Sequence, residues 1–494
     1  MPSRRPVALA VLTTAALVAV GCSDPPSSGN DGSQTATGDG DGNGEATLPE
    51  CPLDALDDAS GPVEVTLWYG GIGGSTEQTM EDMVAGFNAS QDHVELTASN
   101  QGGSFAEVFR KFESAASADT GQLPDLVMLE NIQLQTIADR GLMLPAQACM
   151  EAADYDITDI EPAVRSAFSV NDVLYPGYMN VSSQVLYYNK SHWVKAGLDA
   201  EAPPQTLDEL REQARALKEA RVSEKPLAFK VSHAVFENWL SGEGIDVVDN
   251  DNGQSGLATE AMFDLPESDE LLTFLQDMND EGLLNVFANT EGSIDHFLAL
   301  VQQQSSMLIE TSTAGITFAD ALSGQITAAE AGVDFDESLV DREGLVPGTG
   351  EFPGVESAGQ VHPGGAGFFI VNASEPAQQA ASWRFLEYML RPENAKAWHL
   401  NGGYLPIVKS VADEPDVQAF WADDLGGVLL KPAVDQLGDA DPDEPGPLIG
   451  PYPDFTTELQ DAIEAVLLND ADIGSSLATA EANVTASLER YAGE

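Results

Sequence analysis

The amino-acid sequence predicts an α/β fold, and three observations lead to this prediction. Segments with strand periodicity alternate with segments of helical periodicity between Val63 and Arg140, which is typical of a mainly parallel sheet with right-handed crossovers. The chain has 494 residues, a length that suits two domains or one large bilobed unit. The composition before residue 62 is that of export and linker segments, so we expect the folded part to begin there.

The first 21 residues have the pattern of a secretory signal peptide. Two arginines precede an apolar run at 7–20, which is shorter than the roughly 20 residues that a membrane-spanning helix needs. The run ends just before Cys22, and residues 19–22 resemble the lipobox of bacterial lipoproteins, in which the cysteine is acylated. We therefore expect a signal peptide at 1–21 and a lipid anchor on Cys22, on the extracellular side of the bacterial cytoplasmic membrane. The alternative is cleavage near this point that leaves Cys22 as a free thiol.

A linker is predicted at residues 22–61. Up to residue 50 it is rich in Ser, Gly, Pro, Asp and Thr, which cannot form a core, so we expect a flexible tether. The tether contains a string with the EF-hand pattern, formed by Asp39, Asp41, Asn43, Gly44 and Glu50. We reject calcium binding there, because an EF-hand needs a helix on each side and Pro49 directly precedes the last ligand. No metal or cofactor is predicted elsewhere.

The charge of the chain excludes two classes of partner. The sequence has 81 acidic and 21 basic residues, and its formal net charge is −60. Such a charge repels nucleic acids and anionic lipid surfaces, so neither is expected as an electrostatic partner. Self-repulsion is also costly unless salt screens it, and we therefore expect a saline setting.

Two cysteines, Cys51 and Cys149, follow the lipobox cysteine. Disulfides persist outside the cytoplasm, and we predict a bridge that ties the end of the tether to the folded part. It would close a loop of roughly 100 residues, worth at most about 4–5 kcal/mol in the chain-entropy model. Two buried free thiols are the alternative.

The first predicted strand and helix enclose a glycine loop. Alternating apolar residues at 63–67 predict the strand, and four glycines follow at 70–74, where the backbone can approach a ligand closely. Ser75 and Gln78 have the spacing of a capping box at the start of a helix. This arrangement suits a polar ligand, but the loop lacks the lysine and hydroxyl residue of a nucleotide-binding loop.

A second strand is predicted at 94–98, a helix at 105–112, and a buried third strand at 124–130. Ligands of parallel sheets bind beyond the carboxyl ends of the strands. Because Glu130 ends the third strand and Phe105 follows the second, we expect both to lie near that edge with the glycine loop. Further strands are predicted at 180–190, 307–310 and 364–371, and further helices at 207–218, 271–278, 294–301, 377–390, from 392, 455–468 and 473–491.

Five segments resemble one family in their order along the chain. They read VEVTLWYGG, PDLVMLEN, VLYYNK, FLEYMLRPENAKAWH and NGGYLPI, and together they resemble the extracellular solute-binding proteins of ABC importers, in the class that carries sugars and polyols. Within that class the nearest resemblance is to the glycerol-3-phosphate-binding members. The resemblance implies a periplasmic-binding-protein-like fold of two α/β lobes joined by crossing strands, with the ligand in a cleft between them. It places residues 62–175 and 303–363 in lobe one, and 176–302 and 364–494 in lobe two.

The resemblance also implies a set of ligand-binding residues, a monomer, and delivery of the ligand to the membrane permease of the importer. Aromatic side chains would cover the C–H faces of a sugar or polyol, and a carboxylate, hydroxyls and backbone would bind its hydroxyls. The implied residues are Tyr69, Phe105, Glu130, Ser182, Ser183, Trp239, Thr311, Ser312, Gly364, Gly365 and Tyr404.

One position departs from the resemblance. Leu448 stands where the glycerol-3-phosphate-binding members have their phosphate-binding arginine, and a leucine cannot bind phosphate. We therefore expect a small uncharged sugar or polyol. A glycerol 3-phosphate or glycerophosphodiester ligand is the alternative, with Lys409 as the candidate replacement for the arginine.

Two other classes of function have less support in the sequence. A secreted carbohydrate-active enzyme could use paired carboxylates, but 81 acidic residues make such pairs uninformative, and the zinc-protease and serine-hydrolase motifs are absent. The histidines show no metal-ligand spacing, and His399 is predicted on a helix surface rather than as a base. A structural lipoprotein would show no change on adding ligand. We expect a binding protein rather than an enzyme.

Overall fold

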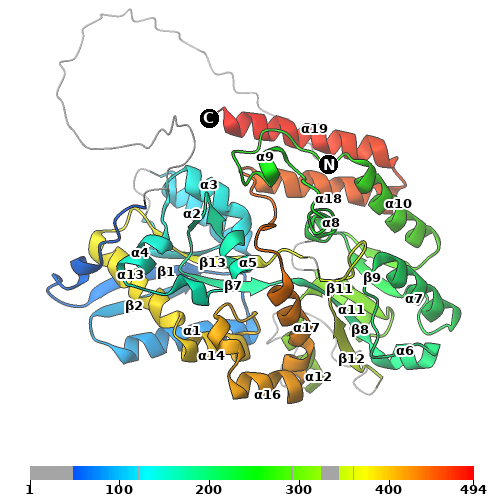
Figure 1. The fold of residues 1–494 in the computed structure, drawn as a ribbon, viewed down its shortest axis with the longest axis horizontal. Helices are drawn as coiled ribbons and strands as arrows, with labels where there is room; N and C mark the ends of the chain where they lie inside the picture. Colours follow the sequence, from blue (N-terminus) through cyan, green and yellow to red (C-terminus); the bar gives the residue numbers. More distant parts are fainter. Residues whose placement is uncertain (1–47, 119–121, 291–292, 324–343, 360, 494) are drawn as a thin grey trace, which may run out of the picture. The chain divides into compact units, whose positions relative to one another are not determined.

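Two large sheets and the helices that cover them make up the computed structural model of the chain (Figure 1). The structure describes residues 48–118, 122–290, 293–323, 344–359 and 361–493, which all belong to one unit, Ala46–Glu494. The predicted signal peptide, Cys22 and the EF-hand string up to Gly44 lie outside the described residues. In the ranges that are described, no helix is both long and apolar enough to cross a membrane.

The first sheet follows the predicted strand–helix alternation. Its strands are β1 (Val63–Tyr69), β2 (Val94–Asn100), β3 (Leu126–Glu130), β4 (Met143–Leu144), β7 (Tyr178–Ser182) and β13 (Gly364–Val371). Their order is β2–β1–β3–β13–β4, and β7 pairs with β13 as well. β1 and β2 are parallel, whereas β13 is antiparallel to β3. The predicted alternation in β1 is confirmed, since Val65 and Leu67 are buried and Glu64 and Thr66 are exposed.

Helices from two parts of the chain surround the first sheet. They are α1 (Gly74–Ser90), α2 (Phe105–Ala116), α3 (Leu134–Asp139), α4 (Ala146–Ala152), α5 (Pro162–Ala167), α13 (Pro376–Met389) and α14 (Pro392–Gly402). Ser104 caps α2, because its side chain accepts a hydrogen bond from the backbone N–H of Glu107. The predicted capping box of α1 is wrong: that helix begins at Gly74, and its cap, Gly73, has no side chain to accept a bond.

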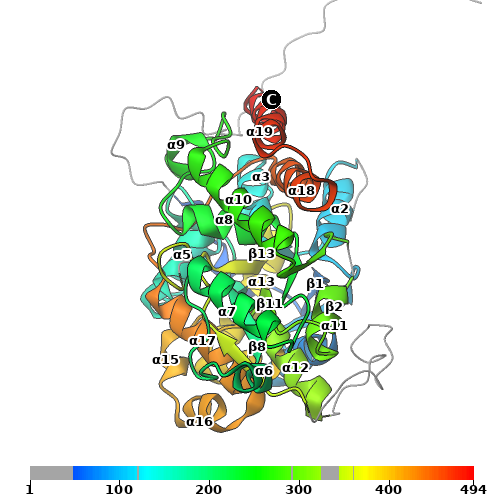
Figure 2. The same ribbon diagram turned by 90° about the vertical axis from the view of Figure 1, so that its right-hand side faces the viewer.

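The second sheet has the order β10–β9–β11–β8–β12. Its strands are β8 (Gln184–Asn189), β9 (Leu227–Lys230), β10 (Leu284–Phe287), β11 (Met307–Thr311) and β12 (Pro347–Gly350). The other long helices are α6 (Lys190–Ala196), α7 (Leu207–Glu219), α8 (His233–Ser241), α10 (Pro266–Asp280), α11 (Asp295–Val301), α12 (Ala314–Ser323), α16 (Pro415–Asp423), α17 (Leu425–Asp439), α18 (Tyr452–Asn469) and α19 (Ile473–Ala492). The last two pack on each other and along α10 (Figures 1 and 2).

Several short elements complete the described structure. They are the strands β5 (Ser169–Val170) and β6 (Val173–Leu174), the helices α9 (Asp249–Asn252) and α15 (Lys409–Ala412), and the single turns η1 (Leu53–Leu56), η2 (Asn131–Gln133) and η3 (Ile157–Asp159). We use "first lobe" for the first sheet with its helices and "second lobe" for the second sheet with its helices. The predicted two-lobed α/β fold is therefore confirmed.

Strand pairing corrects the predicted division of the chain between the lobes. We expected residues 303–363 in the first lobe, but β11 and β12 both pair with β8 of the second sheet. We expected residues 364–494 in the second lobe, but β13 pairs with β3 and β7 of the first sheet, and α13 packs on β1. The physical reason is that periodicity within a segment predicts a strand, whereas its partner depends on hydrogen bonds to residues far away in the chain.

The chain crosses between the lobes at Ser183. The strand β7 ends at Ser182 in the first sheet, and β8 begins at Gln184 in the second. The chain returns to the first sheet between β12 and β13. The segment after β11 lies beside the first crossing, because the backbone N–H of Ser312 donates to the carbonyl oxygen of Ser183 at 2.8 Å. The crossing strands expected from the resemblance are present, and they lie side by side.

The predicted disulfide between Cys51 and Cys149 is confirmed. Their Cα atoms are 5.0 Å apart, and 98 positions separate them in the sequence. Cys149 lies in α4 and is fully buried, and Cys51 leads into η1, which packs on α13. The bridge therefore fastens the segment before β1 to the core of the first lobe.

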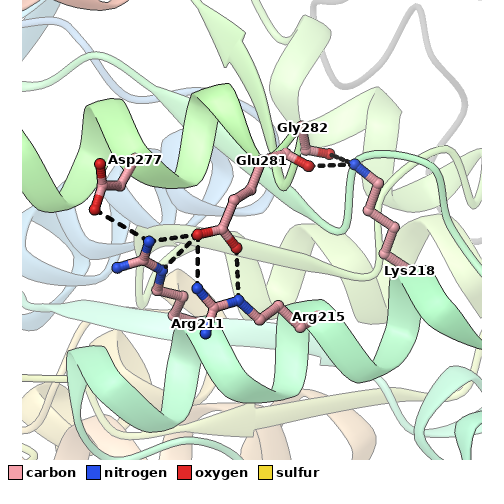
Figure 3. A network of polar contacts seen from close by, with 6 residues as sticks. All are labelled: Arg211, Arg215, Lys218, Asp277, Glu281 and Gly282. Atoms are coloured by element: carbon pink, nitrogen blue, oxygen red, sulfur yellow. Dashed lines mark hydrogen bonds and ion pairs between the residues drawn. The ribbon is translucent and has the colours of Figure 1, made fainter.

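An ion network joins α7 to α10 in the second lobe (Figure 3). Glu281, directly after α10, accepts two hydrogen bonds from Arg215 at 2.5 and 2.6 Å and is also bound by Arg211. Arg211 reaches Asp277 as well, at 3.1 Å, and Lys218 donates to backbone carbonyls at the end of α10. The hydrogen bonds from Arg215 and Arg211 lower the pKa of Glu281 to about 2. The network fixes one helix against its neighbour on the outside of the lobe.

Candidate ligand-binding site

Three strands of the first sheet meet beside Glu130. This residue ends β3 and pairs with Ala366 of β13. The residue before Ala366, Gly365, pairs with Val181 of β7. Gly365 has a φ of 142°, and a Cβ at this position would lie 2.1 Å from the carbonyl oxygen of Asn180. A glycine is therefore required for β13 to approach β7 this closely. The predicted residues Glu130, Gly364, Gly365 and Ser182 are thus brought together at one edge.

The Glu130 carboxyl is half-buried, and among the described residues no basic side chain pairs with it. Burial raises the pKa of Glu130 to about 7, and a hydrogen bond from Gln133 opposes this shift. The side-chain oxygen of Gln133 is buried without a hydrogen-bond partner. Polar groups that are buried and unpaired usually mark a place for water or a ligand. The Glu130 carboxyl, next to this unpaired oxygen, can therefore bind ligand hydroxyl groups in a site that is partly shielded from water.

Tyr404 forms an aromatic wall next to Glu130. Its ring stacks on Trp398, with centroids 6.2 Å apart and an angle of 15° between the planes. Burial, and to a smaller degree the charge of Glu130, raises the pKa of the Tyr404 hydroxyl. The two predicted residues therefore lie near each other, as expected from the resemblance.

His399 holds Tyr404 in place, and the predicted helix-surface position of His399 is wrong. The side chain is fully buried, and its Nδ1 donates to the carbonyl oxygen of Tyr404 at 2.6 Å. Its Nε2 accepts a hydrogen bond from Nε1 of Trp421 at 2.9 Å. Burial lowers the pKa of His399 to about 4, so the ring is neutral near pH 7. Helical spacing predicts that His399 lies on a helix, but it does not show that Trp421 of α16 covers this side of the helix.

Two of the predicted hydroxyl residues lie at the first crossing and directly beside it. The backbone N–H of Ser183 donates to Oγ of Ser312 at 3.3 Å, and Nε2 of Gln436 donates to Oγ of Ser183 at 3.0 Å. Both serines are buried. The hydroxyl of Ser312 thus ties its segment to the crossing at Ser183, and the hydroxyl of Ser183 is bound to Gln436 of α17. Thr311, which is partly exposed, has its hydroxyl 2.9 Å from that of Thr313.

Phe105 and Tyr69 lie on the glycine-loop side of the first lobe. Phe105 begins α2 and lies against Gly71, where a Cβ would come within 2.8 Å of the phenyl ring. The Tyr69 side chain is buried, and its hydroxyl donates to Glu77 of α1 at 3.3 Å. The glycine loop therefore packs closely on Phe105, and Tyr69 serves the core of the lobe.

Trp239 lies apart from this group, in the core of the second lobe. It is buried to 1% exposure, it stacks on Phe352, and its Nε1 donates to the carbonyl oxygen of Pro353 at 2.9 Å. With its polar atom satisfied and both faces covered, Trp239 is a packing residue. Its predicted place in the ligand wall is not what the structure shows.

The second lobe contributes three polar residues that the sequence did not single out. The hydroxyl of Tyr452 donates to Oε2 of Glu237 at 2.6 Å, and burial raises the pKa of Glu237 to about 7. Both residues line a small cavity together with His362 and with Asn131, the residue after Glu130. No local pattern links positions so far apart, so sequence reasoning could not have joined them.

Leu448 is a lobe-to-lobe contact. Its side chain is 8% exposed and packs in an apolar cluster with Leu134 and Ile137 of the first lobe. The backbone N–H of Leu448 donates to the carbonyl oxygen of Asn252 at 2.8 Å. The other candidate for phosphate binding, Lys409, begins α15 and lies near the carboxyls of Asp156 and Glu161.

Comparison with known families gives one match that covers most of the chain. A family model described as bacterial extracellular solute-binding protein matches residues 82–423. The sn-glycerol-3-phosphate-binding periplasmic protein UgpB of Escherichia coli is 22% identical over 84% of this chain and 90% of its own length. The UgpB protein of Pectobacterium atrosepticum is 24% identical over 63% of this chain and 66% of its own length.

Solved structures share the fold. The cyclic α-maltosyl-1,6-maltose binding protein from Arthrobacter globiformis has a TM-score of 0.67 and 24% identity, covering 87% of this chain and all of its own. UgpB from Mycobacterium tuberculosis in complex with glycerophosphocholine has a TM-score of 0.67 and 18% identity, covering 88% and 100%. The sugar-binding protein MalE from Xanthomonas citri has a TM-score of 0.69 and 19% identity, covering 87% and 98%.

Proposed function

Because the chain belongs to the bacterial extracellular solute-binding proteins, we propose that it is the lipid-anchored binding component of an ABC importer for an uncharged sugar or polyol. The ligand lies against Glu130 and Tyr404, between the lobes. Ser182, Thr311 and the backbone at Gly364 supply further polar contacts. Closure about the crossing at Ser183 and the one between β12 and β13 buries the ligand, and the permease receives it from the closed form.

The charge of the site is the observation that supports the proposal of a neutral ligand. Glu130 is half-buried at the strand edge without a basic partner among the described residues, and Glu237 adds a second buried carboxyl. Leu448 packs against the first lobe, and Lys409 lies beside two carboxyls of its own. A phosphate dianion needs a fixed cation such as arginine, and bulk salt screens a buried neighbouring carboxylate poorly.

A thermal-shift screen at high salt tests this function. The probes are maltose, ribitol, glycerol 3-phosphate and glycerophosphocholine, because a ligand that binds only the folded state raises its stability. We expect a neutral sugar or polyol to raise the melting temperature of the wild type. A rise with the phosphorylated probes alone would instead favour the second candidate, a glycerol-3-phosphate or glycerophosphodiester binder, which the glycerol-3-phosphate-binding relatives bring into consideration.

Two further tests separate this function from its rivals. Incubation with oligosaccharides should give no products, and turnover would point to a carbohydrate-active enzyme. The substitution Cys22→Ser should release the protein from the membrane or leave the precursor uncut. A Cys22→Ser protein that is still processed and still membrane-bound would contradict the lipid anchor.

A further inference from the structure

A small cavity lies between the lobes, one residue along the chain from Glu130. Asn131 and Ile132 line it from the first lobe, and Glu237, His362 and Tyr452 line it from the second. Its volume is about 30 Å³. A buried water needs at least about 10–15 Å³ on this measure, so the cavity has room for one or two groups of that size.

His362 presents a hydrogen-bond acceptor to this cavity. Its Nδ1 lies 3.1 Å from the carbonyl oxygen of Glu444, and because a carbonyl only accepts, Nδ1 carries the proton. The backbone N–H of His362 donates to Oδ1 of Asn238 at 2.8 Å, which fixes the residue. Burial lowers the pKa of His362 to about 4, so the ring is neutral near pH 7. The remaining nitrogen, Nε2, therefore has a free lone pair, and it is buried without a hydrogen-bond partner.

Several hydrogen-bond donors around the cavity are already used by the protein. The Tyr452 hydroxyl donates to Glu237 at 2.6 Å, and Nε2 of Gln254 donates to the carbonyl oxygen of Gly446 at 2.7 Å. The hydroxyl of Ser169 donates to a backbone carbonyl at 2.7 Å. The oxygen of the Asn131 amide accepts from Gly365 at 3.4 Å, which leaves its N–H groups. Among the described residues, the cavity therefore offers acceptors on His362 and Glu237, and amide N–H groups of Asn131 and Gln254 as donors.

We propose that this cavity receives one terminal hydroxyl or hydroxymethyl group of the ligand, with Nε2 of His362 as its acceptor. A hydroxyl both donates and accepts, so it satisfies His362 and the Asn131 amide together. A phosphoryl group would bring acceptor oxygens against the lone pair of His362 and the carboxyl of Glu237, and its four heavy atoms exceed the space. His362 and Glu237 are then specificity residues of the site. This assignment rests on the proposed function.

The test uses three pairs of probes that differ by one phosphoryl group: glycerol and glycerol 3-phosphate, ribitol and ribitol 5-phosphate, maltose and maltose 6-phosphate. Affinities are measured by calorimetry at high salt for the wild type, His362→Phe and His362→Gln. In the wild type the neutral member of a pair should bind at least about 10-fold more tightly. His362→Phe, which removes the acceptor, should weaken that neutral member by about 10-fold. His362→Gln, which keeps a polar group at similar reach, should stay within about 3-fold.

The outcomes separate two kinds of failure. If no neutral probe binds, the proposed function fails and this assignment fails with it. If a neutral probe binds but His362→Phe binds it as tightly, or its phosphorylated partner binds as well to the wild type, the assignment alone is overturned. The comparison between pair members uses only the wild type, so a phosphorylated partner that binds as well as the neutral probe overturns the assignment even if His362→Phe does not fold.

Discussion

Glu130 shows how one residue serves both the fold and the site. It completes β3, where the backbone pairs with β13, and its side chain is left half-buried at the edge with only Gln133 as a hydrogen-bond donor. Because burial penalises charge and raises the pKa to about 7, the carboxyl is partly protonated and partly ionised near neutral pH. A group in this state can both donate to and accept from a ligand hydroxyl.

This environment predicts a pH dependence. The pKa of Glu130 is raised from 4.5 to about 7, so its stabilising effect is complete below about pH 4.5 and is lost as the pH rises through 7. Glu130→Gln removes the titration. The unfolding free energy of the variant relative to the wild type should therefore increase between about pH 5 and 8, by up to about 3 kcal/mol.

Urea denaturation at a series of pH values measures the effect of Glu130→Gln. Glu281→Gln is the matched control, because the pKa of Glu281 is lowered to about 2 and it stays ionised over this whole range. The same pH profile for both variants would contradict the account of Glu130.

At the residue scale, the sequence predicted the site residues that lie at strand ends. It missed the polar residues that the second lobe contributes to the site. Phe105 and Glu130 follow predicted strands, and the structure places them at the expected ends. The predictions for Trp239 and His399 used only the residues near them in the sequence. In the structure Trp239 is buried against Phe352, and His399 is buried with a hydrogen bond from Trp421. Contacts of this kind are set by packing, which one segment does not encode.

The disulfide is the strongest single tie at the scale of elements. The pair Cys51→Ala and Cys149→Ala should lower the unfolding free energy by about 2–5 kcal/mol, because the open loop of about 100 residues gains entropy in the unfolded chain. Thermal melts with and without a reductant check this. The reductant should lower the melting temperature of the wild type and leave the double variant unchanged; a wild type that does not respond contradicts the bridge.

The ion network between α7 and α10 should contribute less. The side chains of Arg215 and Glu281 are 49% and 31% exposed, so water and salt weaken their attraction. A double-mutant cycle of Arg215→Ala and Glu281→Gln should give a small coupling energy that decreases as salt is added. Because the pKa of Glu281 is lowered, this coupling should persist above about pH 4.5 and disappear as the pH falls toward 2. A coupling that does not respond to salt would contradict this account.

The sequence predicted the positions of several strands correctly, but it did not predict which strands pair with one another. The strand at 364–371 was predicted at its correct place, and its glycine start proved necessary beside Asn180. Its sheet was predicted wrongly, as was that of β11. The cap of α1 failed for a local reason, since the helix begins one residue earlier than Ser75.

At the scale of the whole molecule, the net charge of −60 governs the solution behaviour. Raising the salt concentration from about 0.01 M to about 1 M shortens the Debye length from about 30 Å to about 3 Å. Repulsion in the folded state should weaken, and the melting temperature should rise with sodium chloride. Sucrose at matched osmolality is the control for non-ionic effects. An equal rise in sucrose, or no rise in salt, would contradict a charge-limited stability.

The two lobes already meet in the described structure through direct polar contacts. The hydroxyl of Thr136 in α3 donates to the carbonyl oxygen of Gly450 at 2.7 Å, and that of Tyr491 in α19 donates to Asp139 at 2.8 Å. Together with Leu448 they hold the second lobe against α3. These contacts lie beside the cavity lined by His362, so closing of the lobes and recognition of the ligand end would occur at one place.

Calorimetric titration tests the central claim, a neutral ligand held by Glu130 and Tyr404, most directly. The neutral sugar or polyol found in the thermal screen and glycerol 3-phosphate are each titrated into the wild type, Glu130→Ala and Tyr404→Ala at high salt. We predict that the wild type binds the neutral compound, that both variants lose this binding, and that glycerol 3-phosphate gives no heat of binding. Micromolar or tighter binding of glycerol 3-phosphate, with the neutral compounds silent, would contradict the account.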